Sequence, residues 1–268
     1  MRVDTLYEKG TALLNEDYYF ADNNLFGVFD GATSLSNTVY ENGLTGGYLA
    51  SSIAGGIFKS NNDSLANLTV KANTAIAKAM ADRGVNLSER CGLWSTSAAV
   101  VRLKKDTFEW IQIGDCMVLA INEDGSCDLL TRHLNHDRET LELWKDMAGS
   151  SQSPILTALK DQVEKIRACM NITYGVLNGE ENALTFLQSG SRSLDGVKHI
   201  LAFTDGFFIP STDPGQGSNF NLLSTLFKKG GLHHVRDYVR RIETSDMTCR
   251  KYPRFKPHDD MAAISITF

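Results

Sequence analysis

The sequence has few of the residues that would mark a specialised class of protein. Cysteines number 5 and prolines 5 in a chain of 268 residues. The cysteines are odd in number and none forms a Cys-x-x-Cys pair, which argues against a disulfide framework and a zinc ribbon. We therefore predict buried free thiols at all of these positions: Cys91, Cys116, Cys127, Cys169 and Cys249.

Long hydrophobic runs are also missing. Apolar stretches such as residues 53–58 fall far short of the ~20 residues that span a bilayer. At the N-terminus, Asp4 and Glu8 lie where a secretory signal needs an apolar segment. The chain is accordingly predicted to be cytoplasmic and to have no membrane partner.

No strong excess of charge of one sign is present. The 27 Lys and Arg residues oppose 32 Asp and Glu residues, for a net charge of −5. This balance lacks the basic footprint of a nucleic-acid-binding protein, so no nucleic-acid partner is expected. The hydrophobic fraction of 42% excludes extended disorder. A chain of this length can still fold around one hydrophobic core, so we predict that residues 1–268 form a single domain. Its oligomeric state is not assigned.

Apolar periodicity predicts helices on either side of a strand-rich middle. Early strands are expected over residues 2–7 and 17–30, with a turn at 21–24, followed by helices over 35–59 and from an N-cap at 61–63 to Gly84. An antiparallel meander is predicted over 97–130 and a helical pattern over 136–170. Later elements are strands at 183–187, 197–203 and 262–268 and helices at 221–228 and 232–243. This order implies an α+β fold, a layered sandwich of sheet on sheet with helices outside.

Several carboxylates follow or precede apolar strands. Asp30 and Asp205 each end such a run and are followed by Gly, Asp115 follows Ile113-Gly114, and Asp259 comes just before the last strand. One such Asp-Gly is an ordinary turn signal. If the strands lie side by side in one central layer, however, their ends bring three to five carboxylates to one edge. Such crowding raises the pKa of each carboxyl, and hard divalent cations are the usual compensation.

The chemistry of this donor set favours Mg²⁺ or Mn²⁺ over zinc. All the candidate donors are oxygens, and no His or Cys has matching spacing. His133 and His136 could form a pair on one helix face, but no third ligand is nearby, and we interpret them as surface residues. Phosphate loops of the G-x-x-x-x-G-K type and G-x-S-x-G elbows are absent. Metal-assisted chemistry on phosphate is therefore the leading class.

The order of these motifs resembles that of the metal-dependent protein serine/threonine phosphatases of the 2C type. The similarity spans most of the chain and comprises seven motifs in the family's order, each of them loose by itself. These are residues 15–20 (Asn-Glu-Asp-Tyr-Tyr-Phe), 25–31, 95–101, 113–116, 174–179, 201–206 and 259–266.

This resemblance implies a four-layer α–β–β–α sandwich with two central antiparallel sheets and a metal centre at one end of them. Its ligands would be Glu16, Asp17, Asp30, the Gly31 carbonyl, Asp115, Asp205 and Asp259, with Asp30, Asp205 and Asp259 as the catalytic set. They would bind two Mg²⁺ or Mn²⁺ ions and a weaker third. The implied reaction is the removal of phosphate from phosphoserine and phosphothreonine of a protein substrate, by direct attack of a metal-bridging water. Residues 131–182 correspond to the family's mobile flap.

Three positions depart from the family pattern. Ala32 stands where many members have a His that helps to protonate the leaving group. No Arg that could bind the phosphate precedes residues 15–20, which we call the first acidic motif. The nearest cation there is Lys9, a poor replacement for a bidentate guanidinium. The phosphate-binding residue is therefore unassigned. Trp94 replaces a Gly before the Ser-Thr pair, which we interpret as a change of packing.

Other functions stay open at this point. The missing Arg agrees with a phosphatase that acts on small molecules. Comparing turnover on phosphopeptides with turnover on phosphometabolites would distinguish it from a protein phosphatase. Ala32 agrees with a catalytically weak module that binds a phosphoprotein or signalling partner, and that module would bind metal with negligible hydrolysis. In an unrelated α+β domain whose Asp-Gly pairs are only turns, Asp30→Asn and Asp205→Asn would leave metal affinity unchanged.

Overall fold

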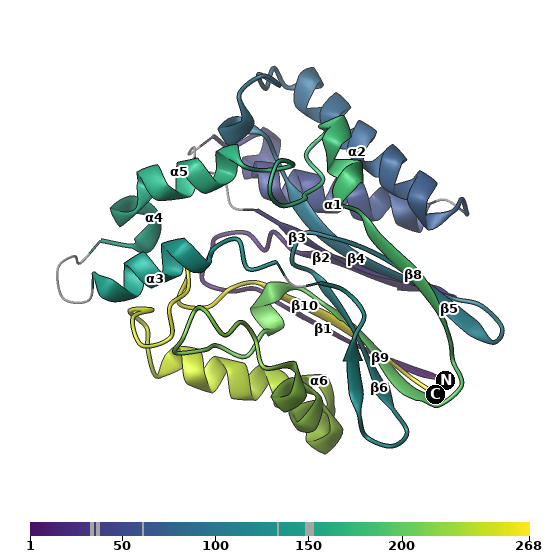
Figure 1. Ribbon diagram of the computed structural model, residues 1–268. Helices are drawn as coiled ribbons and strands as arrows, with labels where there is room; N and C mark the ends of the chain where they lie inside the picture. Colours follow the sequence, from purple (N-terminus) through teal and green to yellow (C-terminus); the bar gives the residue numbers. More distant parts are fainter. Residues whose placement is uncertain (33–34, 36–37, 61, 133, 148–152) are drawn as a thin grey trace.

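Two five-stranded antiparallel sheets form the centre of the computed structural model (Figure 1), which describes residues 1–32, 35, 38–60, 62–132, 134–147 and 153–268. The β1 sheet has the order β1 (Arg2–Glu8), β10 (Met261–Thr267), β9 (Val197–Phe203), β6 (Met117–Asn122) and β7 (Cys127–Leu129). The β2 sheet has the order β2 (Tyr18–Asp22), β3 (Leu25–Gly31), β4 (Thr96–Leu103), β5 (Thr107–Ile113) and β8 (Gln188–Ser193). The first and last strands of the chain are therefore paired in the β1 sheet.

Helices cover the outer face of each sheet (Figure 1). The β2 sheet is covered by α1 (Gly46–Lys59) and α2 (Leu65–Asp82), and the β1 sheet by α6 (Phe220–Thr244). Three further helices, α3 (Arg138–Asp146), α4 (Ile155–Ala158) and α5 (Lys160–Ala168), lie at one end. Short 3₁₀ helices are Glu41–Gly43, Arg90–Gly92, Glu181–Phe186 and Asp205–Phe207. The predicted α–β–β–α sandwich is confirmed.

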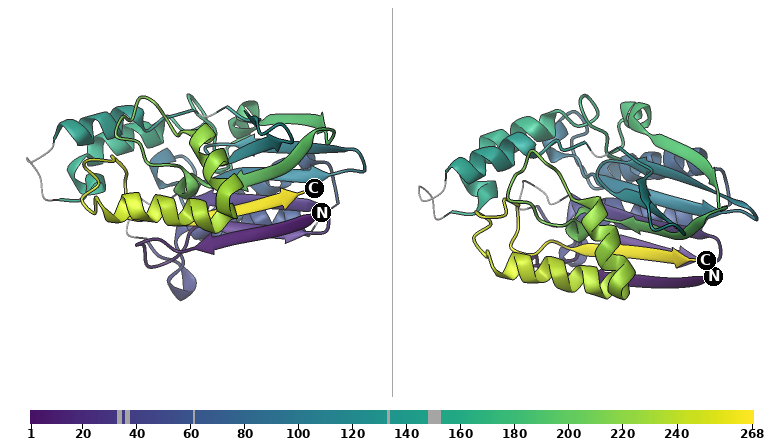
Figure 2. Two further views of the ribbon diagram at one scale, coloured as in Figure 1. Left: turned by 90° about the horizontal axis from the view of Figure 1, so that it is seen from below. Right: turned by 60° about the horizontal axis from the view of Figure 1, so that its bottom comes forward.

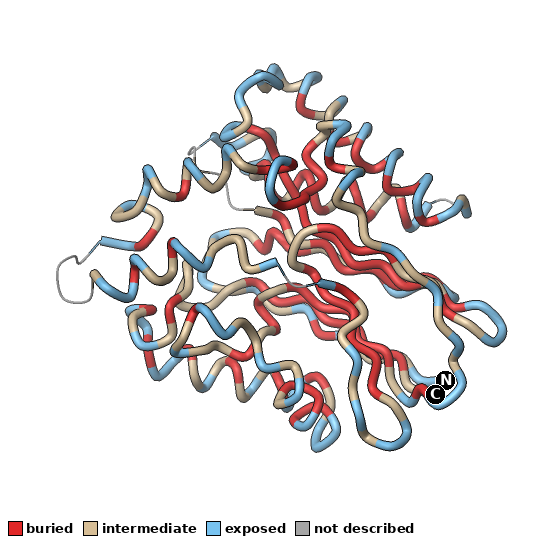
Figure 3. The backbone as a smooth tube through the Cα atoms, in the orientation of Figure 1, coloured by how far each residue is buried: buried red, intermediate tan, exposed pale blue. Residues whose placement is uncertain are grey.

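Strand periodicity explains why the central strands are apolar throughout. On β4, Ala98 and Val100 face the helices, whereas Ala99 and Val101 face the other sheet. Because successive side chains on a strand point to opposite faces, a strand covered on both faces needs apolar residues at every position. Figure 3 shows the resulting burial along the strands of both sheets.

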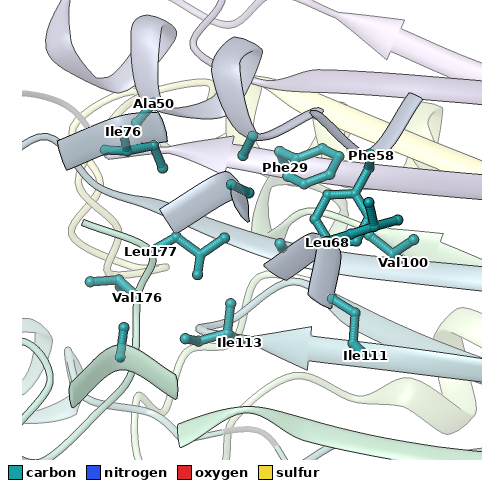
Figure 4. Close-up of a cluster of buried hydrophobic side chains, with 14 of the residues drawn as sticks. Phe29, Ala50, Phe58, Leu68, Ile76, Val100, Ile111, Ile113, Val176 and Leu177 are labelled. Carbon is teal, nitrogen blue, oxygen red and sulfur yellow. The ribbon is translucent and has the colours of Figure 1, made fainter. Parts of the chain in front are cut away.

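The outer core under α1 and α2 is built from side chains of both strands and helices (Figure 4). Phe29 of β3 packs against Phe58 of α1, with ring centroids 5.7 Å apart. Leu68 and Ile76 of α2, at helical spacing, are fully buried in the same cluster. Fully burying side chains of this size stabilises the fold by roughly 1.5–3 kcal/mol each.

The polypeptide termini and the predicted site lie at opposite ends of the sandwich. Arg2 pairs with Thr267 at the terminal end, and both views of Figure 2 show the two termini side by side there, with α3–α5 at the far end. At that far end, Phe203 of β9 is the register partner of Met117 on one side and Ala263 on the other. Asp115, Asp205 and Asp259 lie just beyond these three positions. Among the described residues, no helix combines the length and apolar character needed to cross a membrane.

Two predicted helix starts were wrong, and in both cases a hydroxyl cap sets the true start. The first long helix begins at Gly46 and not at residue 35, because the Thr45 hydroxyl accepts a hydrogen bond from Tyr48 N. The second begins at Leu65, where Ser64 is the N-cap and accepts from Asn67 N. Of the predicted N-cap residues, Asn61 lies outside the described residues and Asp63 instead accepts from Ser64 N.

Other element predictions also need correction. The predicted meander does not stay in one sheet, because β5 belongs to the β2 sheet and β6 to the β1 sheet. Residues 183–187 fall mostly in the 3₁₀ helix Glu181–Phe186, and the strand follows at β8. The two late helices form one element, α6, interrupted by the non-helical backbone of Gly230 and Gly231. All five cysteines are free, but Cys91 is exposed and two others are half-buried, so uniform burial was wrong.

Candidate active site

Most of the predicted ligands line one pocket at the end of the sandwich. Its volume is about 120 Å³, and its lining includes five of the seven predicted ligands, namely Asp30, Gly31, Asp115, Asp205 and Asp259. The other two, Glu16 and Asp17, are 3% and 2% exposed and carry charge that acts on the same cluster. Segments separated by more than two hundred positions in the sequence thus meet at one place.

The strands deliver these carboxylates from both sheets. Asp30 is the penultimate residue of β3 in the β2 sheet, where it pairs with Ser97. Asp205 follows β9 and Asp259 precedes β10, both in the β1 sheet. Asp115 lies in the turn that passes from one sheet to the other, after Gly114 with its positive φ of 81°. The expectation that the strands share one layer was wrong; the pocket forms where two stacked sheets end together.

Hydrogen bonds hold the first acidic motif behind the pocket. The Thr45 hydroxyl donates to Glu16 Oε1 at 2.6 Å, so the cap of α1 also orients a predicted ligand. The Thr204 hydroxyl donates to Asp17 Oδ2 at 2.7 Å. Gly31 N donates to the Glu16 carbonyl at 3.2 Å, which ties this motif to the end of β3.

Asp260 positions this motif, a role that sequence reasoning missed. Its Oδ1 accepts from Gly10 N at 2.8 Å and its Oδ2 from Glu16 N at 2.9 Å. The side chain is 3% exposed. Since a buried carboxylate that accepts backbone N–H groups fixes their position, Asp260 joins the loop before β2 to the start of β10. The sequence contained Asp259-Asp260 as a pair, but nothing in it distinguished the residue facing the pocket from the residue facing the loop.

The electrostatics of the pocket are those of crowded acids. Burial, then the charges of neighbouring aspartates, raises the pKa of Asp30 and Asp205 well above the usual range. The pKa of Asp17 is also well above that range, because burial and the charges of Asp259, Asp260 and Asp205 outweigh the Thr204 hydrogen bond. The charge of Asp30 is the largest contribution, after burial, to the raised pKa of Asp205, so the two carboxyl groups interact electrostatically.

Cationic residues in the pocket were also missed. Among the described residues of its lining, Lys256 and Arg167 are the lysine and the arginine. The Lys256 ammonium donates to Asp259 Oδ1 at 2.7 Å, and Arg167 Nη1 of α5 donates to the Ser95 hydroxyl at 3.4 Å. Lys9, considered from sequence, donates to the Leu13 carbonyl. A Lys three residues before an Asp is unremarkable in a sequence, so nothing there indicated this pairing.

His136 is part of the pocket lining and not a surface residue outside the site. Its ring stacks on Tyr174, with centroids 4.0 Å apart and planes 3° from parallel. The interpretation of His136 as a plain surface residue was therefore wrong. His133, which was considered together with it, lies outside the described residues. A second pocket of about 180 Å³ adjoins the first. The two pockets share seven lining residues: Asp115, His136, Asp137, Asp205, Phe255, Lys256 and Asp259.

The donor set fits divalent cations in its chemistry. All the side-chain donors are carboxylate oxygens, which hard cations prefer, and cations would relieve the repulsion that raises the carboxyl pKa values. Among the described residues, no three His, Cys, Asp or Glu side chains are grouped as ligands of a single ion. In the described arrangement, Glu16, Asp17 and Asp259 are each engaged by a hydroxyl or an ammonium group. Ion binding therefore requires some of these contacts to be exchanged.

Comparison with a model of a protein family agrees with this geometry. Residues 9–248 match the family described as Protein phosphatase 2C. The chain belongs to this family. As a member, it is by class a metal-dependent protein serine/threonine phosphatase. The matched residues include all the predicted ligands except Asp259, which the structure adds to the same pocket.

Solved structures of phosphatases share the fold of this family member. The serine/threonine phosphatase PstP/Ppp of Mycobacterium tuberculosis is 14% identical, with a TM-score of 0.60 over 98% of this chain and 97% of that one. Stp1 of Staphylococcus aureus is 14% identical, with a TM-score of 0.62 over 99% and 94%. The PstP catalytic domain in complex with two manganese ions is 15% identical, with a TM-score of 0.58 over 98% and 96%. Comparison with curated protein sequences finds no match.

Proposed function

We propose that this protein removes phosphate from phosphoserine and phosphothreonine in protein substrates, at the pocket where the two sheets end. The ions are Mg²⁺ or Mn²⁺, and the residues that would hold them are Glu16, Asp17, Asp30, the Gly31 carbonyl, Asp115, Asp205 and Asp259. One observation carries the proposal: strand ends of both sheets direct five of these seven residues into the lining of a single pocket. When bound, the ions supply an activated water and neutralise the phosphoryl oxygens.

The chain's own residues would position the donors and bind the substrate. Asp30 and Asp205, whose charges act on each other, both line the pocket. Asp260 and Thr204 hold Glu16 and Asp17 in place through buried contacts. Arg167, on α5, supplies a guanidinium in the pocket lining, the kind of group that binds a phosphate dianion. Ala32 also lines the pocket and has no group that transfers a proton, so the leaving group must take its proton from another source.

We further propose that residues 1–268 act as one catalytic domain in the cytoplasm, in which residues 131–182 form the flap. This assignment is supported by the position of α3–α5 at the site end of the sandwich (Figure 1). Leu156, Val163 and Arg167 from this segment are part of the pocket lining. Side chains of the same segment would then contact the substrate on either side of the phosphorylated residue.

Hydrolysis of a chromogenic aryl phosphate with Mn²⁺, with Mg²⁺ and after chelation tests the proposal. We expect activity that chelation abolishes and that Asp30→Asn lowers by at least about 100-fold, since even residues behind a metal's ligands cost 10–100-fold. Asp124→Asn, in the exposed turn between β6 and β7, is the matched control and should leave activity unchanged. Chelation-resistant activity would exclude the metal mechanism, and full activity of Asp30→Asn would exclude its assigned role.

Substrate class requires a second comparison. Phosphopeptides and small phosphometabolites are offered at equal concentration to the manganese-loaded protein. The proposal expects higher kcat/KM on phosphopeptides, because the second pocket beside the first offers room for residues that flank the phosphorylated one. Equal or higher kcat/KM on the metabolites would contradict a protein substrate.

A further inference from the structure

Lys256 places a positive charge inside the acidic pocket. Its ammonium is 2.7 Å from Asp259 Oδ1, and its side chain is 18% exposed. The charges of Asp259, Asp30 and Glu16 raise the pKa of this ammonium further, despite its burial. Lys256 therefore contacts one of the residues that we assign to the metal centre and lies in the electrostatic field of two more.

Hydrogen bonds from two arginines hold the backbone on either side of Lys256 in place. Arg254 Nη2 donates to the Glu243 carbonyl at 2.9 Å and Arg254 Nε to the Pro257 carbonyl at 3.2 Å. Arg240 of α6 donates to the Asp259 carbonyl at 2.8 Å. These bonds join the segment before β10 to α6 and fix the point from which the Lys256 side chain reaches Asp259.

One carboxylate oxygen of Asp259 accepts two hydrogen bonds. Its Oδ1 accepts from the Lys256 ammonium and from Asp260 N at 2.9 Å. A divalent ion that binds this carboxylate meets an ammonium already paired with it, and like charges repel strongly at such distances in a partly buried site. Since apparent affinity falls by the fraction of protein that is competent to bind, an internal competitor weakens ion binding without changing the ligands.

We propose that Lys256 is an internal counter-cation of the metal centre, which competes with the divalent ion for Asp259 and must leave this carboxylate when the ion binds. The inference rests on the proposed function, because it takes Asp259 as a metal ligand. Lys256 thereby has two effects of opposite sign. It stabilises the acidic cluster when divalent ions are scarce, and it raises the ion concentration at which the site fills.

Calorimetric titration with Mn²⁺ tests the competition without measuring activity. If the protein with Lys256 bound to Asp259 is about tenfold more abundant than the protein in which this contact is broken, Lys256→Met lowers the apparent Kd for Mn²⁺ about tenfold. In chelator, the same variant should have a lower Tm than the native protein, because a buried carboxylate loses its partner. Lys251→Met, at an exposed position of the same segment, should change neither quantity.

A second control separates direct competition from the loss of one positive charge. Arg167→Met removes a charge from the same pocket but breaks no contact with Asp259, so it should lower the apparent Kd by much less than Lys256→Met. An equal decrease of the apparent Kd for Mn²⁺ in both variants would overturn direct competition. Unchanged or weaker binding by Lys256→Met would overturn the proposal entirely. If Lys256→Met does not fold, Lys256→Gln, which keeps an N–H donor but has no charge, replaces it with the same expected direction.

The native protein offers a measurement that needs no variant. With ¹⁵N-labelled lysine, the proposal expects one slowly exchanging ammonium signal in chelator, which Mg²⁺ abolishes or shifts because the ammonium leaves Asp259. A signal that Mg²⁺ leaves unchanged, or no protected signal in chelator, would contradict it. These outcomes are distinct from failure of the proposed function, in which the native protein would show no metal-dependent hydrolysis at all.

Discussion

The hydroxyl of Thr204 donates to Asp17 Oδ2 at 2.7 Å, and so joins two residues that are 187 positions apart in the sequence. Thr204 follows β9 in the β1 sheet, whereas Asp17 precedes β2 in the other sheet. The same hydroxyl accepts from Ala262 N at 2.9 Å. One buried hydroxyl thus connects the first acidic motif to both strands that carry Asp205 and Asp259.

Replacing this hydroxyl should destabilise the protein. Thr204→Val leaves a buried carboxylate and a buried backbone N–H without a partner, which costs about 1–3 kcal/mol for such groups. The measurement is urea unfolding in chelator. Thr225→Val, which removes an exposed hydroxyl on α6, is the control and should change stability by less than about 0.5 kcal/mol. Equal stability of the two variants would show that the Thr204 contact does not hold the motif.

Gly31 is required by a close approach of two backbones. A Cβ at this position would lie 2.3 Å from the Gly47 carbonyl oxygen, at the start of α1. Gly31→Ala should therefore move the end of β3 away from α1, destabilise the fold by about 1–3 kcal/mol and weaken Mn²⁺ binding. Unfolding in denaturant and a Mn²⁺ titration measure the two effects.

The control for this substitution lies on the same helix. Gly56 has nothing within 4 Å of an added Cβ. Gly56→Ala should therefore raise stability by about 0.5–1 kcal/mol, since Ala is the better helix former, and leave Mn²⁺ affinity unchanged. Loss of affinity in this variant, or no loss in Gly31→Ala, would contradict the explanation.

Trp94 packs over the start of α1. Its indole N–H donates to the Tyr40 hydroxyl at 2.9 Å, and a Cβ on Gly46 would lie 2.3 Å from its ring. The side chain is 4% exposed. We expect Trp94→Ala to cost about 3–5 kcal/mol through the cavity that it leaves, measured by thermal unfolding. Trp110→Ala, on the half-buried face of β5, should cost less; a reversed order would refute the assigned packing role.

Glu8 gives the protein a pH-dependent contribution to stability. Burial alone would raise the pKa of this carboxyl, but hydrogen bonds from Arg240 and Arg236 of α6 outweigh burial and lower it. A group whose pKa is lower in the folded state stabilises the protein above its unfolded pKa, about 4.3, and this contribution is lost as the pH falls through the folded value.

Glu8→Gln should therefore lower stability by about 1 kcal/mol at pH 7, a modest figure because the pair is partly exposed. The difference from the native protein should stay constant above about pH 5 and shrink as the pH falls below 4.3. Denaturant unfolding at several pH values measures it, with Glu123→Gln in an exposed turn as the control. A difference that is the same at pH 7 and pH 3.5 would argue against an ionised Glu8.

Local patterns in the sequence were sufficient for most elements and for naming the carboxylates that we propose as ligands. Nearly continuous apolar runs made β3, β4 and β9 recognisable, because a strand that is covered on both faces has apolar residues on both. Asp30, Asp115, Asp205 and Asp259 could be named since each adjoins such a strand. Helix starts failed where a single hydroxyl, on Thr45 or Ser64, decides between several candidate caps. The 3₁₀ helix Glu181–Phe186 was mistaken for a strand because a short apolar run has no distinctive period.

The amino-acid sequence by itself determined the class of fold, the strand ends that carry acids and the oxygen-rich character of the site, because these depend on residue type and short-range spacing. Tertiary structure alone decided that both sheets contribute to the pocket, that Asp260 faces the N-terminal loop while Asp259 faces the site, and that Lys256 enters the acidic cluster. These three features depend on contacts between the segment before β10 and residues about 240 positions earlier, or on the stacking of two sheets. No short-range pattern encodes such contacts, since packing in three dimensions sets which of two neighbouring side chains points inward.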